Sequence, residues 1–222
     1  MLKQMISDLI PSCCDIGFLN ISDCSSLEQS LVKEFFEETN TIIVLAHNVK
    51  SSLEWMWYPH EAERNNNTCG ADLHVKNIIE KIKHSLKEKG YKSYIVPYPG
   101  KSGLRMKDLA NKTAMGQIGD NYLFLHREWG PWTHLRLLLT NAQIEDDSAT
   151  DIDVCIHCGN CISACPSKAI KEDSFNGITC GQYQSSQCMD IQDNYHWKCE
   201  VCARVCPVGK SPLPLQILSN ET

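Results

Sequence analysis

The chain has 222 residues, of which 42% are hydrophobic and 22% charged, so we expect one substantial core with a small second domain rather than a disordered protein. A formal net charge of −6 leaves no basic excess to neutralise phosphates, which argues against nucleic acid as a partner. No apolar run reaches the roughly 18 residues of a membrane span, and the amino terminus lacks a signal-peptide pattern, so we expect a cytoplasmic protein.

The first part of the chain carries helix and strand patterns in alternation. Residues 27–38 are typical of a helix, and residues 41–47 (TIIVLAH) are typical of a buried strand because the run is short, apolar and rich in β-branched residues. Over residues 74–90, apolar side chains recur at helical spacing with lysines opposite, and residues 91–98 form the next predicted strand. A helix between two strands predicts an α/β layer.

Shorter elements follow before an acidic segment. They are a helix over residues 107–115, a glycine-containing break over 116–119, and strands over 122–126 and 135–140. The acidic run 145–151 (EDDSATD) is typical of a solvated linker. We therefore predict an α/β domain over residues 1–148 and a second domain over residues 149–222.

Cysteine dominates the second domain. Of the thirteen cysteines, nine lie between residues 155 and 206. In a protein expected in the cytoplasm, this crowding favours metal binding over disulfides. The other four are expected to be buried free thiols: Cys13, Cys14, Cys24 and Cys69.

The spacing of these cysteines predicts two [4Fe–4S] clusters. Residues 155–166 (CIHCGNCISACP) have the bacterial ferredoxin spacing, in which the fourth cysteine serves the other cluster, and residues 199–207 (CEVCARVCP) repeat its last three cysteines. The predicted first set is Cys155, Cys158, Cys161 and Cys206, and the second is Cys165, Cys199, Cys202 and either Cys180 or Cys188. Structural zinc sites are the alternative, although repeated three-cysteine runs followed by proline are not typical of zinc.

Residues 109–144 (LANKTAMGQIGDNYLFLHREWGPWTHLRLLLTNAQI) resemble the block that precedes the cysteine motif in the epoxyqueuosine reductase and reductive dehalogenase superfamily. The segments CCDIGFLNISD and TIIVLAH also resemble the opening of that family. Its members join a nitroreductase-like, cobalamin-binding α/β domain to a two-cluster ferredoxin-like domain, so the resemblance implies an α/β (α+β) fold here. The family also places an isolated cysteine before a small residue and an aromatic, as in residues 180–183 (CGQY), which implies Cys180 as the eighth ligand.

The resemblance further implies a cobalamin site. In the superfamily, cobalamin lies base-off beside one cluster, whose low potential suits the reduction of cobalt to Co(I). The implied cofactor contacts are Met115, Gly116, Gln117, Ile118, Gly119, Asn121, Gly130 and Trp132. An ordinary helix-to-strand turn is the alternative explanation for the glycines.

The chain departs from the family at the proton donor. Epoxyqueuosine reductases carry an aspartate before the block, whereas residues 96–104 here (VPYPGKSGL) contain no acid. Reductive dehalogenases use a tyrosine near a basic residue, so the resemblance implies Tyr98 with Lys101, or Tyr58 from the aromatic stretch that also holds Trp55 and Trp57.

We therefore predict a compact cobalamin-dependent iron–sulfur reductase supplied by an external low-potential donor of ferredoxin or flavodoxin type. The chain ends at Thr222 without the helical repeat that helps many epoxyqueuosine reductases hold tRNA, which favours another substrate. The alternative function is an electron-transfer or activator protein that reduces a corrinoid on a partner protein.

Overall fold

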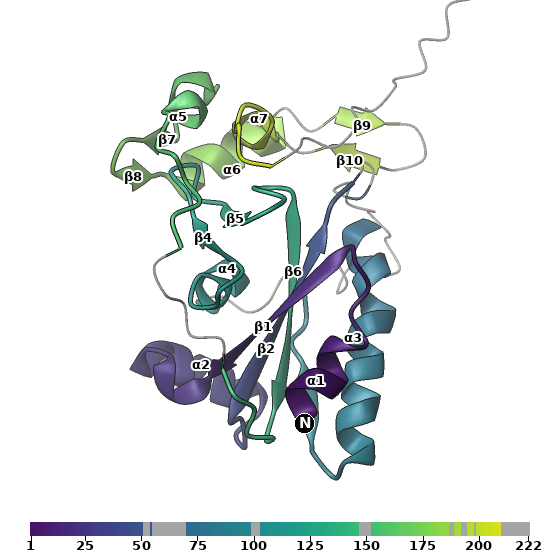
Figure 1. Cartoon of the computed structure of the whole chain (residues 1–222). Helices are drawn as coiled ribbons and strands as arrows, with labels where there is room; N and C mark the ends of the chain where they lie inside the picture. The colour runs from purple at the N-terminus through teal and green to yellow at the C-terminus, as the bar shows by residue number, and fades with distance from the viewer. Residues whose placement is uncertain are drawn as a thin grey trace, which may run out of the picture.

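The computed structural model describes residues 1–50, 54, 70–98, 103–146, 152–186, 189–191, 195–197 and 199–209 (Figure 1). Its helices are α1 (Leu2–Ser7), α2 (Ser26–Phe35), α3 (Gly70–Glu88), α4 (Met106–Ala110), α5 (Asn160–Ala164), α6 (Gly177–Ser186) and α7 (Val201–Arg204), with a 3-10 turn at Ile21–Asp23. Its strands are β1 (Cys14–Asn20), β2 (Thr41–Asn48), β3 (Ser93–Ile95), β4 (Gly116–Ile118), β5 (Phe124–His126), β6 (Thr133–Thr140), β7 (Ile170–Lys171), β8 (Ser174–Phe175), β9 (Met189–Ile191) and β10 (Tyr195–Trp197). None of the helices in these ranges is long and apolar enough to cross a membrane.

A four-stranded sheet in the order β1-β2-β6-β3 forms the centre of the first domain. Each neighbouring pair is antiparallel. Because β2 and β3 both run antiparallel to β6, they run parallel to each other, as the connection through α3 requires. The predicted mixed helix and strand class is therefore confirmed, with an α+β arrangement.

Both faces of the sheet are buried. On one face, Ile43 and Leu45 of β2 pack in a cluster with the apolar stripe of α3, which includes Val75 and Ile79. On the other face, Val44 joins a second cluster formed with α2 and α4. Figure 1 shows α1 and α3 on one side of the sheet and α2 and α4 on the other. Burial on both sides explains why β2 is an almost continuous apolar run instead of an alternating one.

The predicted strand at 41–47 and the helices at 27–38 and 74–90 are confirmed, with bounds that differ by a few residues. A capping box between Ser25 and Glu28 sets the start of α2. The strand predicted over residues 91–98 is shorter, since only Ser93–Ile95 pairs with β6.

The prediction for residues 107–119 was wrong in part. The helix ends at Ala110, and the predicted break contains strand β4, which pairs with β5 in a hairpin. The Asn111 side chain explains the change, because its Oδ1 accepts the Ile118 backbone N–H at 2.6 Å and thereby closes the turn before the hairpin. The aromatic residues Trp55, Trp57 and Tyr58, together with Cys69, lie outside the described residues.

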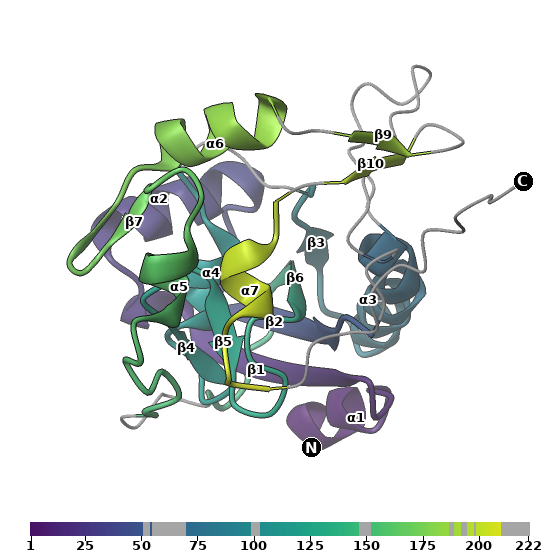
Figure 2. The ribbon, with the colours of Figure 1, turned by 90° about the horizontal axis from the view of Figure 1, so that it is seen from above.

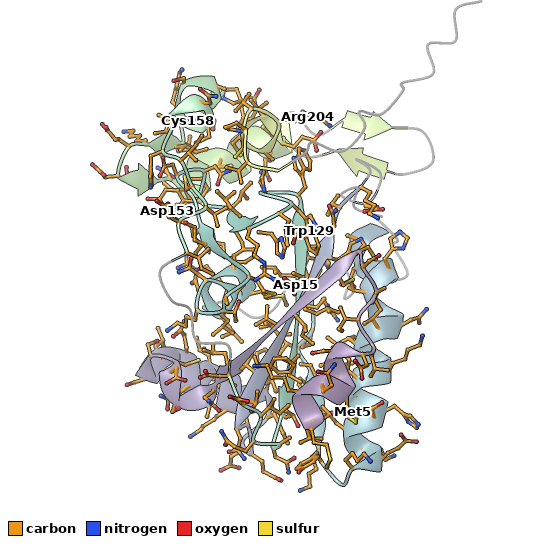
Figure 3. The ribbon with its side chains drawn as sticks, viewed as in Figure 1. Met5, Asp15, Trp129, Asp153, Cys158 and Arg204 are labelled. Atoms are coloured by element: carbon orange, nitrogen blue, oxygen red, sulfur yellow. The ribbon has the colours of Figure 1, made fainter. Side chains whose placement is uncertain are left out.

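The carboxy-terminal region lies over the β4–β5 end of the first domain. Figure 2, viewed from above, shows α5, α6 and α7 gathered there, and Figure 3 shows Cys158 and Arg204 in this region and Met5 at the far end of the molecule. The predicted domain boundary falls within residues 147–151, outside the described part, and stays a prediction.

Backbone contact joins the two regions at Gly130. This residue has φ +58°, and a Cβ there would lie 2.0 Å from the carbonyl oxygen of Val208. Gly209 approaches the other side in the same way, since its Cβ would lie 2.3 Å from the carbonyl carbon of Trp129. The segment that follows Cys206 can therefore lie against the first domain only because both contact positions are glycine.

Replacing Gly130 with alanine should destabilise the protein more than replacing Gly90 does. Gly90 has φ +84° but nothing within 4 Å of an added Cβ. The Gly90→Ala variant therefore measures only the cost of holding alanine in a left-handed backbone conformation, about 1–2 kcal/mol of folding free energy. Gly130→Ala adds the clash with Val208. We expect a lower Tm and weaker iron retention for Gly130→Ala in thermal unfolding of the cluster-loaded protein. Equal Tm changes for the two variants would show that the contact is unimportant.

Candidate metal centre and adjoining cavity

The structure gathers the eight predicted ligand cysteines into two groups. A small cavity is lined by the first set, Cys155, Cys158, Cys161 and Cys206. A larger cavity is lined at one end by the second set, Cys165, Cys180, Cys199 and Cys202. Cys165 of the first motif thus lies with cysteines of the second motif, and Cys206 of the second motif lies with cysteines of the first. Cys188 lies outside the described residues.

Two members of the first set, Cys155 and Cys158, lie in a loop that the β4–β5 hairpin supports. The Gln117 side-chain oxygen accepts hydrogen bonds from the backbone N–H groups of Val154 and Cys155, the latter at 3.3 Å. Asp120 Oδ1 lies 2.9 Å from Nδ1 of His157 in the same loop. Gln117 therefore positions the backbone of Cys155, the first predicted ligand, a role that the sequence did not indicate.

The second set depends on α6 and α7. Cys180 is half-buried in α6, where the Gln184 amide donates to its sulfur at 3.6 Å, and Cys202 lies in α7. Burial, with the neighbouring thiols Cys199 and Cys180, raises the pKa of Cys202 to about 12. Burial also raises the pKa of Cys180. A bound cation such as iron would therefore be needed to favour the thiolate forms of Cys180 and Cys202.

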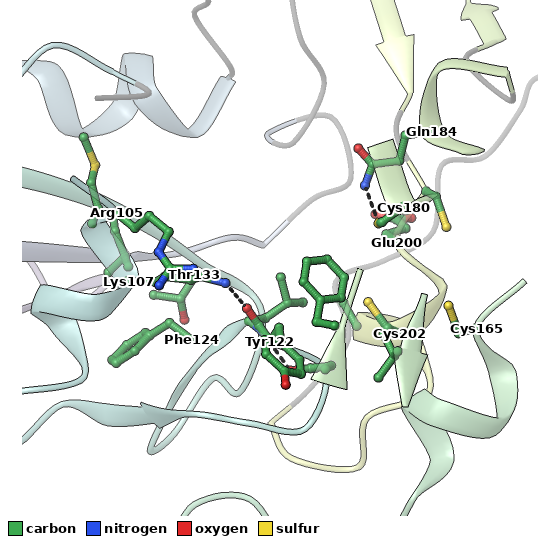
Figure 4. A pocket seen from close by; sticks show the side chains of 18 of the residues that line it. Arg105, Lys107, Tyr122, Phe124, Thr133, Cys165, Cys180, Gln184, Glu200 and Cys202 are labelled. Carbon is green, nitrogen blue, oxygen red and sulfur yellow. Dashed lines mark hydrogen bonds between the residues drawn. The ribbon is translucent and has the colours of Figure 1, made fainter. Parts of the chain in front are cut away.

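The larger cavity extends from the second set towards the sheet domain and has a volume of about 650 Å³. Figure 4 shows Arg105, Lys107 and Phe124 on one side of it and Cys165, Cys180 and Cys202 on the other. Its other apolar and aromatic lining residues include Tyr98, Leu104, Met106, Tyr122, Leu123, Leu135 and Phe175. Volume and lining are those of a site for a cofactor or a small organic ligand.

A basic group lies at the wall opposite the cysteines. The Lys107 ammonium donates to the backbone carbonyl of Tyr122, and burial lowers the pKa of Lys107. Arg105 is more exposed and pairs with Asp108 at 2.6 Å. This side of the cavity can therefore receive an anionic or polar edge of a ligand.

Of the eight predicted cobalamin contacts, Asn121 lines the larger cavity. It also lines the smaller one, and its Oδ1 accepts the Leu123 N–H at 3.0 Å, so it lies between the two cysteine groups. Gly116 and Gly119 lie close to another part of the protein, the strand residue Leu125, and not to the larger cavity. A Cβ added at Gly116 would lie 2.0 Å from Leu125 O, and one added at Gly119 would lie 2.5 Å from Leu125 Cδ1.

The other predicted contacts have packing or support roles in the fold. Met115 and Trp132 are buried in the core, Gly130 contacts Val208, and Gln117 supports the first cysteine loop. Ile118 pairs with Phe124 in the hairpin. The seven residues other than Asn121 are not among those that line the larger cavity, so their contact with a cofactor stays a prediction.

Tyr98 reaches the cavity within a polar group that the sequence did not reveal. Its ring centroid lies 4.8 Å from that of His134, which also lines the cavity, and 5.9 Å from the guanidinium carbon of Arg136. Asp72 Oδ1 lies 3.1 Å from His134 Nε2 and 3.4 Å from Arg136 Nε. Burial lowers the pKa of His134, which favours the neutral imidazole. Lys101 and Tyr58 lie outside the described residues.

Comparison with known proteins agrees with this arrangement. Residues 154–210 match the family described as a 4Fe-4S dicluster domain. The chain is 33% identical over 110 residues to the epoxyqueuosine reductase of Lactococcus garvieae, covering 46% of this chain and 31% of the relative. It is 26% identical over 174 residues to that of Vibrio cholerae, covering 71% and 46%. The chain thus spans about a third to a half of the length of these curated relatives.

Solved structures give the same fold. Epoxyqueuosine reductase from Streptococcus thermophilus superposes with a TM-score of 0.63 at 21% identity, covering 96% of this chain and 66% of the other. An epoxyqueuosine reductase solved with a modified tRNA stem loop superposes with a TM-score of 0.69 at 17% identity, and the match covers 95% of this chain and 64% of the other. The reductive dehalogenase NpRdhA superposes with a TM-score of 0.62 at 13% identity, and the match covers 89% of this chain and 30% of the other.

Fold and sequence together define an α+β protein with a carboxy-terminal 4Fe-4S dicluster domain. The predicted resemblance to the epoxyqueuosine reductase and reductive dehalogenase superfamily is confirmed, and the curated relatives carry the name of an oxidoreductase. One protein of this fold is solved with a modified tRNA stem loop, and the expectation that this chain does not bind nucleic acid stays a prediction.

Proposed function

We propose that this chain is a cytoplasmic, cobalamin-dependent iron–sulfur reductase that takes electrons one at a time from an external low-potential donor of ferredoxin or flavodoxin type. The observation that carries the proposal is the cavity of about 650 Å³ whose wall contains all four cysteines of the second set. A ligand in this cavity would lie beside the cluster that those cysteines hold, with no further protein layer between them.

The side chains present fit a large cofactor of mixed polarity. Leu104, Phe124 and Leu135 supply an apolar wall, and Arg105 and Lys107 offer cations towards polar groups at the cofactor's edge. When bound, cobalamin would supply a cobalt centre able to exchange electrons with the substrate. The apolar wall would exclude water from the reacting groups.

The chain's own residues divide the remaining tasks. The first cysteine set holds the cluster nearer the surface loop of Cys158, and the second set holds the cluster beside the cavity. Asn121 lines both cavities and connects them. We assign Tyr98 as the proton donor, since it lines the cavity and the nearby Arg136 guanidinium would stabilise the phenolate left after proton transfer.

Cobalamin retention tests the proposal. The protein is reconstituted anaerobically with iron, sulfide and cobalamin, then desalted and examined by ultraviolet–visible and paramagnetic resonance spectroscopy. We expect bound base-off cobalamin together with about eight iron atoms per chain, the number in two [4Fe–4S] clusters. The first probe substrate is 3-bromo-4-hydroxybenzoic acid, with which NpRdhA has been solved.

A matched pair of variants locates the cofactor. Leu123→Trp should fill part of the cavity and weaken cobalamin retention at least tenfold, with the iron content unchanged. Leu27→Trp is the control, because Leu27 is 68% exposed on α2. Equal retention by both variants would place the cofactor elsewhere. Two clusters without any cobalamin would favour the alternative, an activator protein that reduces a corrinoid on a partner.

A further inference from the structure

A second group of metal-binding side chains lies where β1 begins and β2 ends. Cys14 and His47 are direct partners in the β1–β2 register, and Cys13 precedes Cys14. The Cys13 and Cys14 sulfurs are 4.0 Å apart, and the Cys14 sulfur is 3.6 Å from His47 Nδ1. All three donor atoms lie within 4.8 Å of one another, with Cys14 and His47 buried and Cys13 half-buried.

These separations match a tetrahedral zinc site. Zinc–sulfur and zinc–nitrogen bonds of about 2.3 and 2.0 Å at tetrahedral angles place two sulfurs about 3.8 Å apart and a sulfur and a nitrogen about 3.6 Å apart. Only a small movement of Cys13 would therefore bring the donors to bonding distance. Two thiolates and an imidazole form a soft donor set that favours zinc over magnesium or calcium.

The far side of the imidazole faces a carboxylate. His47 Nε2 lies 3.4 Å from Glu54 Oε2, although the two do not form a hydrogen bond in the structure. Glu54 is itself held, because the same oxygen accepts the Lys50 backbone N–H at 2.9 Å and its other oxygen lies 3.7 Å from His74 Nε2. A hydrogen bond from Nε2–H to this carboxylate, formed when the metal binds, would direct the lone pair of Nδ1 towards the metal.

We propose that Cys13, Cys14 and His47 bind a zinc ion, with Glu54 as the carboxylate behind the histidine. The ion would join the outer strand β1 to β2 at the end of the sheet that includes His134, since His47 pairs directly with His134 of β6. It thereby stabilises the strand ends beside the cavity. Cys13 and Cys14 are free thiols in the structure, as expected, with Cys14 buried and Cys13 half-buried. The proposal adds a ligand role to them.

X-ray absorption at the zinc edge tests the site in the cluster-loaded protein, because the iron of the clusters absorbs at a different energy. After dialysis against zinc-free buffer, we expect one zinc per chain in addition to about eight irons, with two sulfurs at about 2.3 Å and a nitrogen at about 2.0 Å. Cys14→Ser and His47→Gln should each lower zinc affinity at least tenfold.

Cys24→Ser is the matched control, because Cys24 is also a buried thiol but packs in the other core cluster. It should retain zinc. If Cys14→Ser does not fold, Glu54→Gln keeps all three donors and should still weaken zinc binding about 10–100-fold. The proposal would be overturned if the protein retained no zinc, or if Cys14→Ser and Cys24→Ser contained equal amounts of zinc. It would also be overturned if zinc were bound by sulfur alone and iron were lost, because zinc would then occupy a cluster site.

Discussion

Replacing Cys180 with serine is expected to lower the iron content of the reconstituted protein from about eight to about four atoms per chain. The reason is its position, since Cys180 lines the same end of the cavity as Cys165, Cys199 and Cys202. Without the fourth thiolate, the cluster beside the cavity should be lost while the first set keeps its own. Iron analysis and the paramagnetic resonance spectrum of the reduced protein measure the change.

Cys188→Ser separates the two candidates for the eighth ligand. It should keep about eight irons, as should Cys24→Ser, which removes a buried thiol far along the chain from both motifs. If Cys188→Ser loses the cluster and Cys180→Ser does not, the ligand assignment drawn from the family resemblance is wrong. The proposed electron path would then need a different arrangement at α6.

The Tyr98→Phe variant should keep both clusters and the cobalamin but reduce the probe substrate about 10²–10⁴-fold more slowly in a single turnover. The change removes the phenolic proton and leaves the ring contact with His134, 4.8 Å between centroids, in place. The measurement is the rate of product formation by the loaded, pre-reduced protein.

Tyr94→Phe is the control for this effect. Tyr94 is 38% exposed on β3 and stacks on Phe35, and it is not among the residues that line the cavity. Its rate should equal that of the unmodified protein. An unchanged rate in Tyr98→Phe would mean that the proton comes from another group and that Tyr98 only shapes the cavity.

Local patterns predicted the features that depend on neighbouring residues. The apolar run at residues 41–47 predicted β2, because a strand buried on both faces is apolar throughout. The stripe over residues 74–90 predicted α3, because a helix buried on one face has apolar residues at helical spacing. Cysteine spacing predicted seven of the eight cysteines that line the two cavities, and the family resemblance added Cys180. Strand β4, the first half of the hairpin, was missed because the hydrogen bond that closes the turn before it is accepted by a side chain outside the hairpin, that of Asn111.

The sequence by itself thus determined the class of the protein, and it predicted how the cysteines divide between two clusters, since cluster geometry dictates short, repeated spacings. Only the tertiary structure decided the wall of the cavity, where His134 and Leu123 join Tyr98, and the grouping of Cys14 with His47. Those residues lie far apart in the chain. Strand register and the packing of loops against the sheet bring them together, and neither leaves a local pattern in the sequence.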